Sequence, residues 1–386
     1  MMLKIGYQKQ SLTIYEELEN KIYLSSVLES LVAVLLDKRD YEQAQLYLDN
    51  LKKINEEEEN KEINLRYQFS RALFLKSSPR LRDRGRAEEI LKQITEQDII
   101  YIETTSNALI NLCDLLLLEL QMTNDIEILN EINHTISRLL DIAEKNNSYS
   151  LLAETYLLQA RLALLTLESK KARRLITQAQ SIAEQHGLKL LAMKISNEHD
   201  ELLKQQKIWE NLKEKNAPLK DRMKYAHLDD QIERMVQRRA IENPDLSAEN
   251  PVILLIISEG GEPIFSQSFM KEWTFEDSLL GGFLTAVNSF SGEIFSEGLD
   301  RASFGQYTLL MKPISPFSVC YLFKGQTYLA QKRLQIFIES IQNNKEIWQT
   351  ILKFHQERQI IQIKDIPGLE PLITDTFITK NISLND

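Results

Sequence analysis

The residue types that could do chemistry are present in this chain, but their spacing gives no recognisable site. Neither Cys113 nor Cys320 has a neighbouring base, and two cysteines so far apart define no zinc motif or disulfide framework. No Gly-x-Ser-x-Gly nucleophile elbow occurs. Five histidines lie along polar stretches, without a second ligand at metal spacing: His134, His186, His199, His227 and His355. We therefore expect no metal and no catalytic residues.

Two glycine-containing segments invite comparison with phosphate-binding loops. Gly281–Gly282 lies inside an apolar helical pattern, and no Gly-Lys-Ser/Thr follows it. Gly325–Gln326–Thr327 lacks the lysine that such a loop requires. Close packing of helix against sheet explains these glycines more simply. We expect no nucleotide and no other cofactor.

Composition and charge limit the classes of partner. The chain has 386 residues, of which 43% are hydrophobic and 26% charged, with a net charge of −10. This length and composition predict two or three globular domains, and the acidic balance argues against nucleic-acid binding. No apolar run is long enough for a membrane span, and residues 1–10 show no signal-peptide core. We expect a cytoplasmic protein without direct membrane insertion.

Glycine and proline divide the chain into parts with different structure. Nine of the 12 glycines lie at or after Gly260, and most prolines lie at or after Pro218. Helices tolerate few such residues, whereas the turns of a sheet require them. We therefore predict a helical array over residues 1–217, a connecting helix and linker over 218–250, and an α+β domain over 251–386. Because residues 243–250 read as a linker, residues 247–386 should fold alone.

The helical part contains paired apolar stripes. Leu28, Leu31, Val32 and Leu35 form one stripe, and Ala44, Leu48 and Leu51 form the next. The pattern returns at Tyr156 and Ala160, and then at Ala172, Ile176 and Ala179, while Ala87, Leu91 and Ile94 mark another second helix. The small residues at these positions let paired helices approach closely.

These stripes resemble tetratricopeptide repeats (TPRs) over about residues 10–207. The resemblance implies an all-α repeat solenoid with a concave groove for other proteins. In that register Leu157, Arg161 and Leu164 would face the groove and bind a partner. The alternatives are a non-repeating helical bundle and, for Leu157 and Leu164, packing against a neighbouring helix.

The connecting segment 218–242 is expected to form one helix. Its basic residues suit either a phosphate-bearing or acidic partner, or a solvated face balanced by nearby acids. These residues are Lys220, Arg222, Lys224, Arg234, Arg238 and Arg239.

The C-terminal part alternates strand and helix patterns. Val252–Ile257 is uniformly apolar, which predicts an interior strand buried on both faces. A Gly260–Gly261 turn leads to a partner strand, Ile264–Phe269. We expect this strand at a sheet edge, where its backbone can pair with a strand of another protein. A helix over about 274–292 follows, and then three strands and two helices. The three strands are predicted at Arg301–Phe304, Tyr307–Lys312 and Phe317–Lys324.

This order resembles longin and roadblock-type domains, which share a profilin-like antiparallel sheet. The segments that carry the likeness cover about residues 250–342: ILLIISEGGEPIFSQSF, LLGGFLTAVNSFSGEIF, and FGQYTLLMK leading to YLFKGQTYLAQKRLQIFIESIQ. They also look like domains that follow helical repeats in uncharacterised archaeal proteins. The alternative is a generic small α+β sandwich.

The two resemblances imply a non-catalytic scaffold or adaptor for protein–protein interaction, acting with small GTPases in a regulatory or trafficking assembly. A second hypothesis is a sensor whose helical array binds a peptide or small ligand while its C-terminal domain forms a homodimer. A third is an enzyme whose active site is assembled from distant residues. A buried polar cluster with perturbed pKa values in a deep pocket would favour the third.

Overall fold

The computed structural model describes residues 10–379 except 16, 98–100, 238–248, 259–261, 270–300 and 305. It consists of a helical array and a five-stranded antiparallel sheet with helices, as the sequence predicts. The chain forms two compact units, which we call the first unit (Met1–Leu165 and Ala217–Ala240) and the second unit (Thr166–Asn216 and Ile241–Asp386). These units divide the chain at different positions from the expected boundary between residues 217 and 218.

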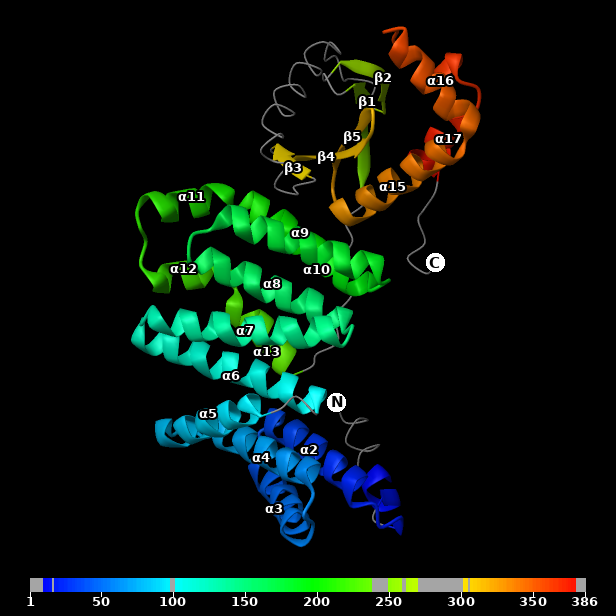
Figure 1. Cartoon of the computed structure of the whole chain (residues 1–386). Coiled ribbons are helices and arrows are strands. Elements are labelled where there is room, and N and C mark those ends of the chain that lie inside the picture. The colour runs from blue at the N-terminus through cyan, green and yellow to red at the C-terminus, as the bar shows by residue number, and fades with distance from the viewer. Residues whose placement is uncertain are drawn as a thin grey trace. The chain divides into compact units, whose positions relative to one another are not determined.

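The first unit is a succession of antiparallel helix pairs. In chain order its helices are α2 (Lys21–Asp37), α3 (Tyr41–Glu57), α4 (Lys61–Lys76), α5 (Leu81–Glu96), α6 (Ile102–Thr123), α7 (Glu127–Lys145), α8 (Tyr149–Leu165), α12 (Leu219–Ala226) and α13 (Leu228–Val236). Each helix from α2 to α8 packs on the next, and α4 also contacts α2 and α6. One side of this unit is therefore built from α2, α4 and α6 (Figure 1).

Local sequence explains where these helices begin and how they pair. Asn20, Asp40 and Asn60 each accept a hydrogen bond from a backbone N–H in the first turn of α2, α3 and α4. The two apolar stripes expected at residues 28–35 and 44–51 are buried in one common cluster. The predicted pairing of these two helices is confirmed.

The sequence pattern predicted that the connecting segment is one helix, and this prediction is wrong. The segment breaks at His227, whose φ of 48° places it in the left-handed region and ends α12. Arg161 of α8 donates a hydrogen bond to the His227 carbonyl at this break. The bend lets α12 pack on α8 while α13 packs on both α6 and α8. Residues 238–242 lie outside the described residues.

The second unit contains the sheet, with helices before and after it in the chain. Its helices before the sheet are α9 (Ser169–Gln185), α10 (Lys189–Lys204) and α11 (Gln206–Glu214). The strands are β1 (Asn250–Ser258), β2 (Pro263–Ser268), β3 (Arg301–Phe304), β4 (Tyr307–Ile314) and β5 (Phe317–Lys324). After them come α15 (Thr327–Asn343), α16 (Lys345–Gln356), the short helix η1 (Ile363–Asp365), α17 (Leu369–Ile373) and η2 (Thr374–Thr379).

The strand order is β2-β1-β5-β4-β3, and all neighbouring strands are antiparallel. The five predicted strands are confirmed, and β1 is an interior strand whose residues Val252–Ser258 are all buried. The expected turn at Gly260–Gly261 and the expected helix over 274–292 fall outside the described residues. Strand β2 lies at an edge, as expected, but the backbone N–H of Ile361 already donates to the Ile264 carbonyl there, at 2.7 Å.

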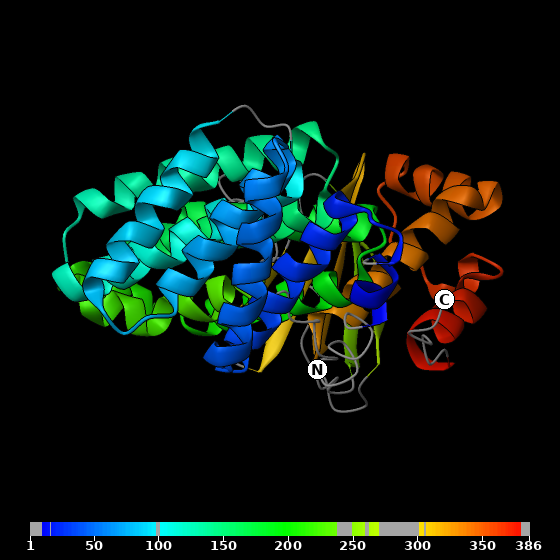
Figure 2. The same cartoon turned by 90° about the horizontal axis from the view of Figure 1, so that it is seen from below.

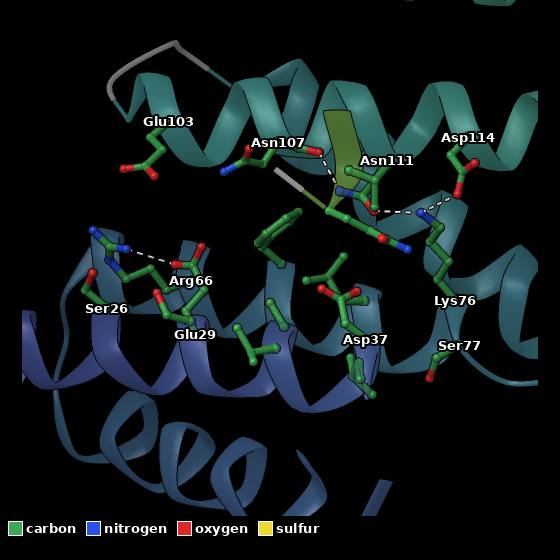
Figure 3. Close-up of a pocket in the computed structure, with 18 of the residues that line it drawn as sticks. Ser26, Glu29, Asp37, Arg66, Lys76, Ser77, Glu103, Asn107, Asn111 and Asp114 are labelled. Atoms are coloured by element: carbon green, nitrogen blue, oxygen red, sulfur yellow. Dashed lines mark hydrogen bonds and ion pairs between the residues drawn. The ribbon is translucent and has the colours of Figure 1, made fainter. Parts of the chain in front are cut away.

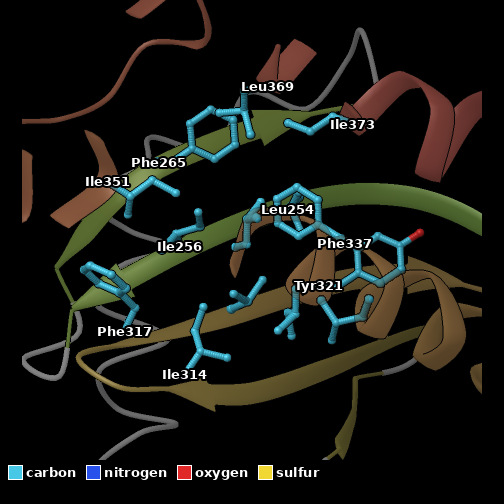
Figure 4. Packing of buried hydrophobic residues seen from close by; sticks show 14 of the residues in the cluster. Leu254, Ile256, Phe265, Ile314, Phe317, Tyr321, Phe337, Ile351, Leu369 and Ile373 are labelled. Atoms are coloured by element: carbon cyan, nitrogen blue, oxygen red, sulfur yellow. The ribbon is translucent and has the colours of Figure 1, made fainter. Parts of the chain in front are cut away.

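The two faces of the sheet carry separate apolar clusters. Alternate β5 residues, including Phe317, Tyr321 and Phe323, join Phe337 and other residues of α15–α17 in the larger cluster (Figure 4). Figure 2 shows these helices on one side of the sheet. The intervening β5 residues Cys320 and Leu322 belong to a second buried cluster with alternate residues of β1. Burial on both faces explains why β1 is uniformly apolar rather than alternating.

A buried arginine joins the α9–α10 helix pair to the sheet. Arg301 begins β3, and its side chain is fully buried. Its guanidinium donates to Gln180 Oε1 of α9 at 2.6 Å and to Asp200 Oδ1 of α10 at 3.0 Å. The Thr327 hydroxyl of α15 donates to the same Asp200 oxygen at 2.9 Å. This network explains why residues 166–216 form a compact unit with the sheet.

Candidate functional site

The main candidate site is an elongated cavity of about 480 Å³ on the first unit, which we call the α2–α4–α6 groove (Figure 3). Three parallel helices supply most of its walls, and α5 and the end of α13 contribute the rest. It is lined by Ser26, Glu29, Ser30, Ala33, Val34, Leu36, Asp37, Arg66, Phe69, Leu73, Lys76, Ser77, Arg84, Glu103, Asn107, Asn111, Asp114, Leu118, Val236 and Gln237.

The spacing of the lining residues sets the direction of the groove. On each of the three helices they recur every three or four positions, so they form one face that runs along the helix axis. At 1.5 Å per residue, the stretch from Ser26 to Asp37 covers about 16 Å. The groove is therefore a channel parallel to its helices rather than a round pocket.

Two fixed ion pairs cross the groove walls. Arg66 of α4 binds Glu29 of α2 at 2.9 Å and Glu62 of its own helix at 2.8 Å. Burial alone would lower the pKa of Arg66, but the hydrogen bonds and charges of Glu62 and Glu29 outweigh burial and raise it. Arg66 therefore stays charged and holds α2 against α4.

The second pair links α4 to α6. Lys76 Nζ lies 2.6 Å from Asp114 Oδ2 and donates to Asn111 Oδ1 at 2.7 Å. The Asn111 amide nitrogen donates in turn to the Asn107 carbonyl at 2.9 Å. Lys76 thus positions the Asn111 carboxamide and the Asp114 carboxylate together.

The groove has an apolar floor and a carboxamide wall. Phe69 is buried, and Leu73 and Val34 add further apolar surface. On α6, Asn107 and Asn111 lie four positions apart and face the groove. The Asn107 Nδ2 atom is buried and has no hydrogen-bond partner within the described part of the chain. This combination suits a ligand with both a polar backbone and apolar side chains.

The residues that the sequence assigned to a partner-binding face occupy other places. Leu157 is fully buried and Leu164 is 5% exposed, so neither lines an open groove. Arg161 bonds the His227 carbonyl at the break between α12 and α13. Helices α12 and α13 return onto α8, which no repeat pattern predicts. The alternative that the two leucines pack against a neighbouring helix describes this structure.

The basic residues of the connecting segment differ in their surroundings, and two of them bind other parts of the chain. Arg222 donates to the carbonyls of Ala217 and Leu165, at 2.7 and 2.9 Å. Arg234 pairs with Glu154 of α8 at 2.8 Å, with both side chains mostly buried. Lys224 pairs with Asp221 on the surface, as a solvated face predicts. Arg238 and Arg239 lie outside the described residues.

The other sequence candidates have structural roles. Thr327, from the segment compared with a phosphate loop, binds Asp200 and begins α15, while Gly281–Gly282 lies outside the described residues. Burial raises the pKa of the Cys113 thiol to about 12 and raises that of Cys320 further. Burial, together with the charges of Arg301 and Arg173, lowers the pKa of His199 well below its usual value. Among the described residues, no group of His, Cys, Asp and Glu has the arrangement of a metal site.

A second cavity of about 720 Å³ lies on the second unit and contains a buried carboxyl. Glu249 accepts a hydrogen bond from the Tyr321 hydroxyl, and its other oxygen lies 2.8 Å from Arg333 Nε. Burial raises the pKa of Glu249 to about 7, although the Arg333 charge acts to lower it. This is the type of cluster that the enzyme hypothesis requires.

Sequence reasoning missed both sites. The asparagines of the groove left a weak signal, because Asn107 and Asn111 lie four positions apart in the largely apolar segment NALINLCDLLLLEL. Glu249 left none, because it falls in the expected linker. In the sequence, Arg66 and Lys76 cannot be distinguished from surface cations, because their partners lie on other helices.

Comparison of the chain with protein-family models, with curated proteins and with solved structures finds no match. Within the described ranges, no helix is both long enough and apolar enough to cross a membrane. The case for a function therefore rests on the geometry of the two units.

Proposed function

We propose that the protein is a non-catalytic interaction scaffold or adaptor that binds a peptide segment of another protein in the α2–α4–α6 groove. The observation that supports this most is the groove itself, in which ion pairs and carboxamides surround an apolar floor. Such a channel on stacked helix pairs is how helical solenoids, including TPR arrays, present a surface to peptides. The groove replaces Leu157 and Leu164 as the partner-binding surface.

The proposed role of the second unit is to dock a small GTPase. The strand order β2-β1-β5-β4-β3, with helices against one face, supports a longin- or roadblock-like assignment. The alternative is a sensor in which the groove binds a peptide or small ligand and the second unit forms a homodimer. Both alternatives use the same groove and differ only in what the second unit binds.

The groove is tested with one substitution and a matched control. Ser30 is a small residue of the α2 wall, so Ser30→Tyr should fill the groove without touching its ion pairs. Ser137 is exposed on α7 outside the groove, so Ser137→Tyr adds the same side chain elsewhere. The two variants and the unmodified chain are used to capture partners from cells, and the captured proteins are quantified by mass spectrometry.

We expect Ser30→Tyr to reduce the recovery of specific partners by about tenfold or more, as a steric block in a binding pocket does. Ser137→Tyr should leave recovery unchanged, and both variants should match the thermal stability of the unmodified chain within a few degrees. Equal recovery with all three proteins would reject the groove as the binding surface.

The GTPase role is tested separately. The intact chain is titrated with small GTPases in both nucleotide states while its own mass in solution is measured. Affinity that depends on the nucleotide state supports the adaptor role. A stable homodimer with no affinity for any of them supports the sensor alternative.

A further inference from the structure

The exposed side of α5 carries three arginines that make no contact with charged or polar groups of the chain itself. Arg80 precedes the helix, and Arg82 and Arg86 lie four positions apart on one exposed side of it. Within the described part of the chain, none of these three side chains forms a hydrogen bond or an ion pair. Arg84 differs, because its Nε donates to the Ser78 carbonyl at 3.1 Å and its side chain lines the α2–α4–α6 groove.

Gly85 lies on the same exposed side of α5, and the packing of this chain does not require it. A Cβ atom at this position would meet no neighbouring heavy atom within 4 Å beyond the backbone of the helix itself. The position is inside a regular helix, where glycine is less favourable than alanine. A glycine in such a place lets the backbone of another helix lie close to α5. Gly85 therefore indicates a point of close approach between Arg82 and Arg86.

The residues around Gly85 form an amphipathic surface, and we call Leu81, Arg82, Gly85 and Arg86 the α5 face. Leu81 and Gly85 lie four positions apart in one row along the helix, and Arg82 and Arg86 form the adjacent row. Leu81 is 62% exposed, so an open apolar row lies beside a basic row. Glu89, one turn after Gly85, is exposed and ends the cationic stretch. This arrangement is complementary to a helix with an apolar stripe flanked by carboxylates.

The charge of the whole chain limits the class of partner for this surface. A net charge of −10 repels nucleic acids and anionic membranes at long range. Nucleic-acid binding also neutralises many phosphates, each with its own cation, whereas this side of α5 supplies only a few arginines. A protein segment that carries a few carboxylates at helical spacing matches the number and the spacing of these cations.

We infer that the α5 face is a second interaction surface, on which an acidic amphipathic helix of another protein lies across Gly85. Two carboxylates four positions apart on that helix pair with Arg82 and Arg86, because both sets of side chains have the same spacing of about 6 Å. An apolar side chain of the partner contacts Leu81. None of the four residues of the α5 face lines the α2–α4–α6 groove, so this inference goes beyond the proposed function and can hold without it.

The experiment uses displayed helical peptides of roughly 20 residues, long enough to form helix, with one face randomised and selected on the intact chain. Parallel selections use the double variant Arg82→Glu, Arg86→Glu and a matched control, Lys207→Glu, Lys364→Glu. The control makes the same change in net charge at two exposed lysines of the second unit. The most enriched peptide is synthesised with a fluorescent label, and its affinity for each protein is measured by anisotropy.

Three further variants locate the contact. Gly85→Leu adds a side chain where the backbone of the partner should lie, and Gly85→Ala adds one methyl group that favours the free helix. Ser30→Tyr blocks the groove and leaves the α5 face intact. A thymidine oligonucleotide and vesicles of phosphatidylserine and phosphatidylcholine are titrated against the same proteins, and circular dichroism verifies that every variant is folded.

We expect the enriched helices to carry two aspartates or glutamates four positions apart beside an apolar residue. Arg82→Glu, Arg86→Glu should weaken binding about tenfold or more, and so should raised salt concentration to a smaller degree. The lysine control and Ser30→Tyr should bind as the unmodified chain does. Gly85→Leu should weaken binding by a similar factor, whereas Gly85→Ala should weaken binding and still raise the midpoint of thermal unfolding by about 2 °C.

Several results would overturn the inference. Enrichment of no acidic helix, or equal binding by Arg82→Glu, Arg86→Glu, would show that these arginines bind no such partner. Full affinity in Gly85→Leu would show that no helix crosses the α5 face at this point. Tighter binding of the oligonucleotide or the vesicles through the two arginines would assign the surface to another class of partner. Peptide binding that only Ser30→Tyr abolishes would support the groove and reject the α5 face.

Discussion

At the residue scale, the most unusual group is Glu249. Its side chain is 1% exposed and lies between the Tyr321 hydroxyl and the Arg333 guanidinium, which also donates to the Thr376 carbonyl at 2.9 Å. The carboxyl thereby ties the start of β1 to α15 and to the C-terminal helix η2. Desolvation nevertheless outweighs the favourable charge of Arg333, which is why the pKa of Glu249 rises to about 7.

This raised pKa predicts how stability depends on pH. The unfolded chain has the ordinary glutamate value of 4.5, so the ionised form is less favourable in the folded chain. The stabilising contribution of the protonated carboxyl is fully present below pH 4.5 and is lost as the pH rises through about 7. Glu249→Gln, which imitates the protonated form, should be more stable than the unmodified chain at pH 8, by up to about 3 kcal/mol.

The measurement is denaturant unfolding of both proteins at pH 5 and pH 8. At pH 5 the difference between the two free energies of unfolding should be much smaller than at pH 8. A difference that is the same at both pH values would mean that Glu249 does not titrate in this range.

At the element scale, the Arg301 side chain joins α9, α10 and α15 to the sheet. One guanidinium is held by residues of α9, α10 and α15, and Gln180 also donates to Gln331 of α15 at 2.6 Å. Loss of one member of a buried ion pair leaves its partner without compensation, which typically costs about 3–5 kcal/mol.

We predict that Arg301→Leu lowers the free energy of unfolding by about 3 kcal/mol or more, because Asp200 loses its ion-pair partner and the buried Gln180 Oε1 loses a donor. Lys353→Leu, at an exposed cation of α16 in the same unit, should change it by about 0.5 kcal/mol or less. Hydrogen exchange should show the loss of protection in α9, α10 and β3. Equal effects of the two substitutions would show that the network contributes little.

The break at His227 is a second feature that depends on packing between helices. Local pattern favours one continuous helix over 218–242, and no proline or glycine follows Pro218 within that range. Bending lets α12 pack on α8 and α13 pack on α6 and α8, and Leu219, Ala226, Ile232 and Met235 are buried. The gain in burial outweighs the cost of a left-handed histidine.

At the scale of the whole molecule, the two units predict which fragments fold. Residues 247–386, expected from the sequence to be an independent domain, lack α9 and α10 and leave Arg301 without its α-helical partners. We expect that fragment to unfold at low denaturant concentration with a shallow transition. Residues 166–386, with 217–240 replaced by a glycine–serine linker of equal length, should unfold cooperatively with a steeper dependence on denaturant.

Circular dichroism and tryptophan fluorescence during denaturant titration measure both transitions, and the intact chain provides the reference. Coincident curves by the two probes in the longer fragment would identify a single cooperative unit. If the 247–386 fragment proves as stable as the longer one, the α9–α10 pair is an accessory to the sheet rather than part of its core.

What the sequence determined by itself is the set of local elements. Apolar periodicity located the helix pairs and the five strands, because the residues that an element buries recur at the period of that element. The uniformly apolar Val252–Ile257 indicated an interior strand for the same reason. The distribution of glycine and proline separated the helical part from the sheet.

Only the tertiary structure decided which elements associate and which side chains meet. The sharing of α9–α10 with the sheet, the return of α12–α13 to α8, and the meeting of Arg66 with Glu29 or Lys76 with Asp114 all join residues far apart in the chain. A charged residue has the same sequence signature whether its partner is water or a carboxylate on another helix. Polar sites such as the groove, Arg301 and Glu249 therefore become visible only when the helices and strands are packed together.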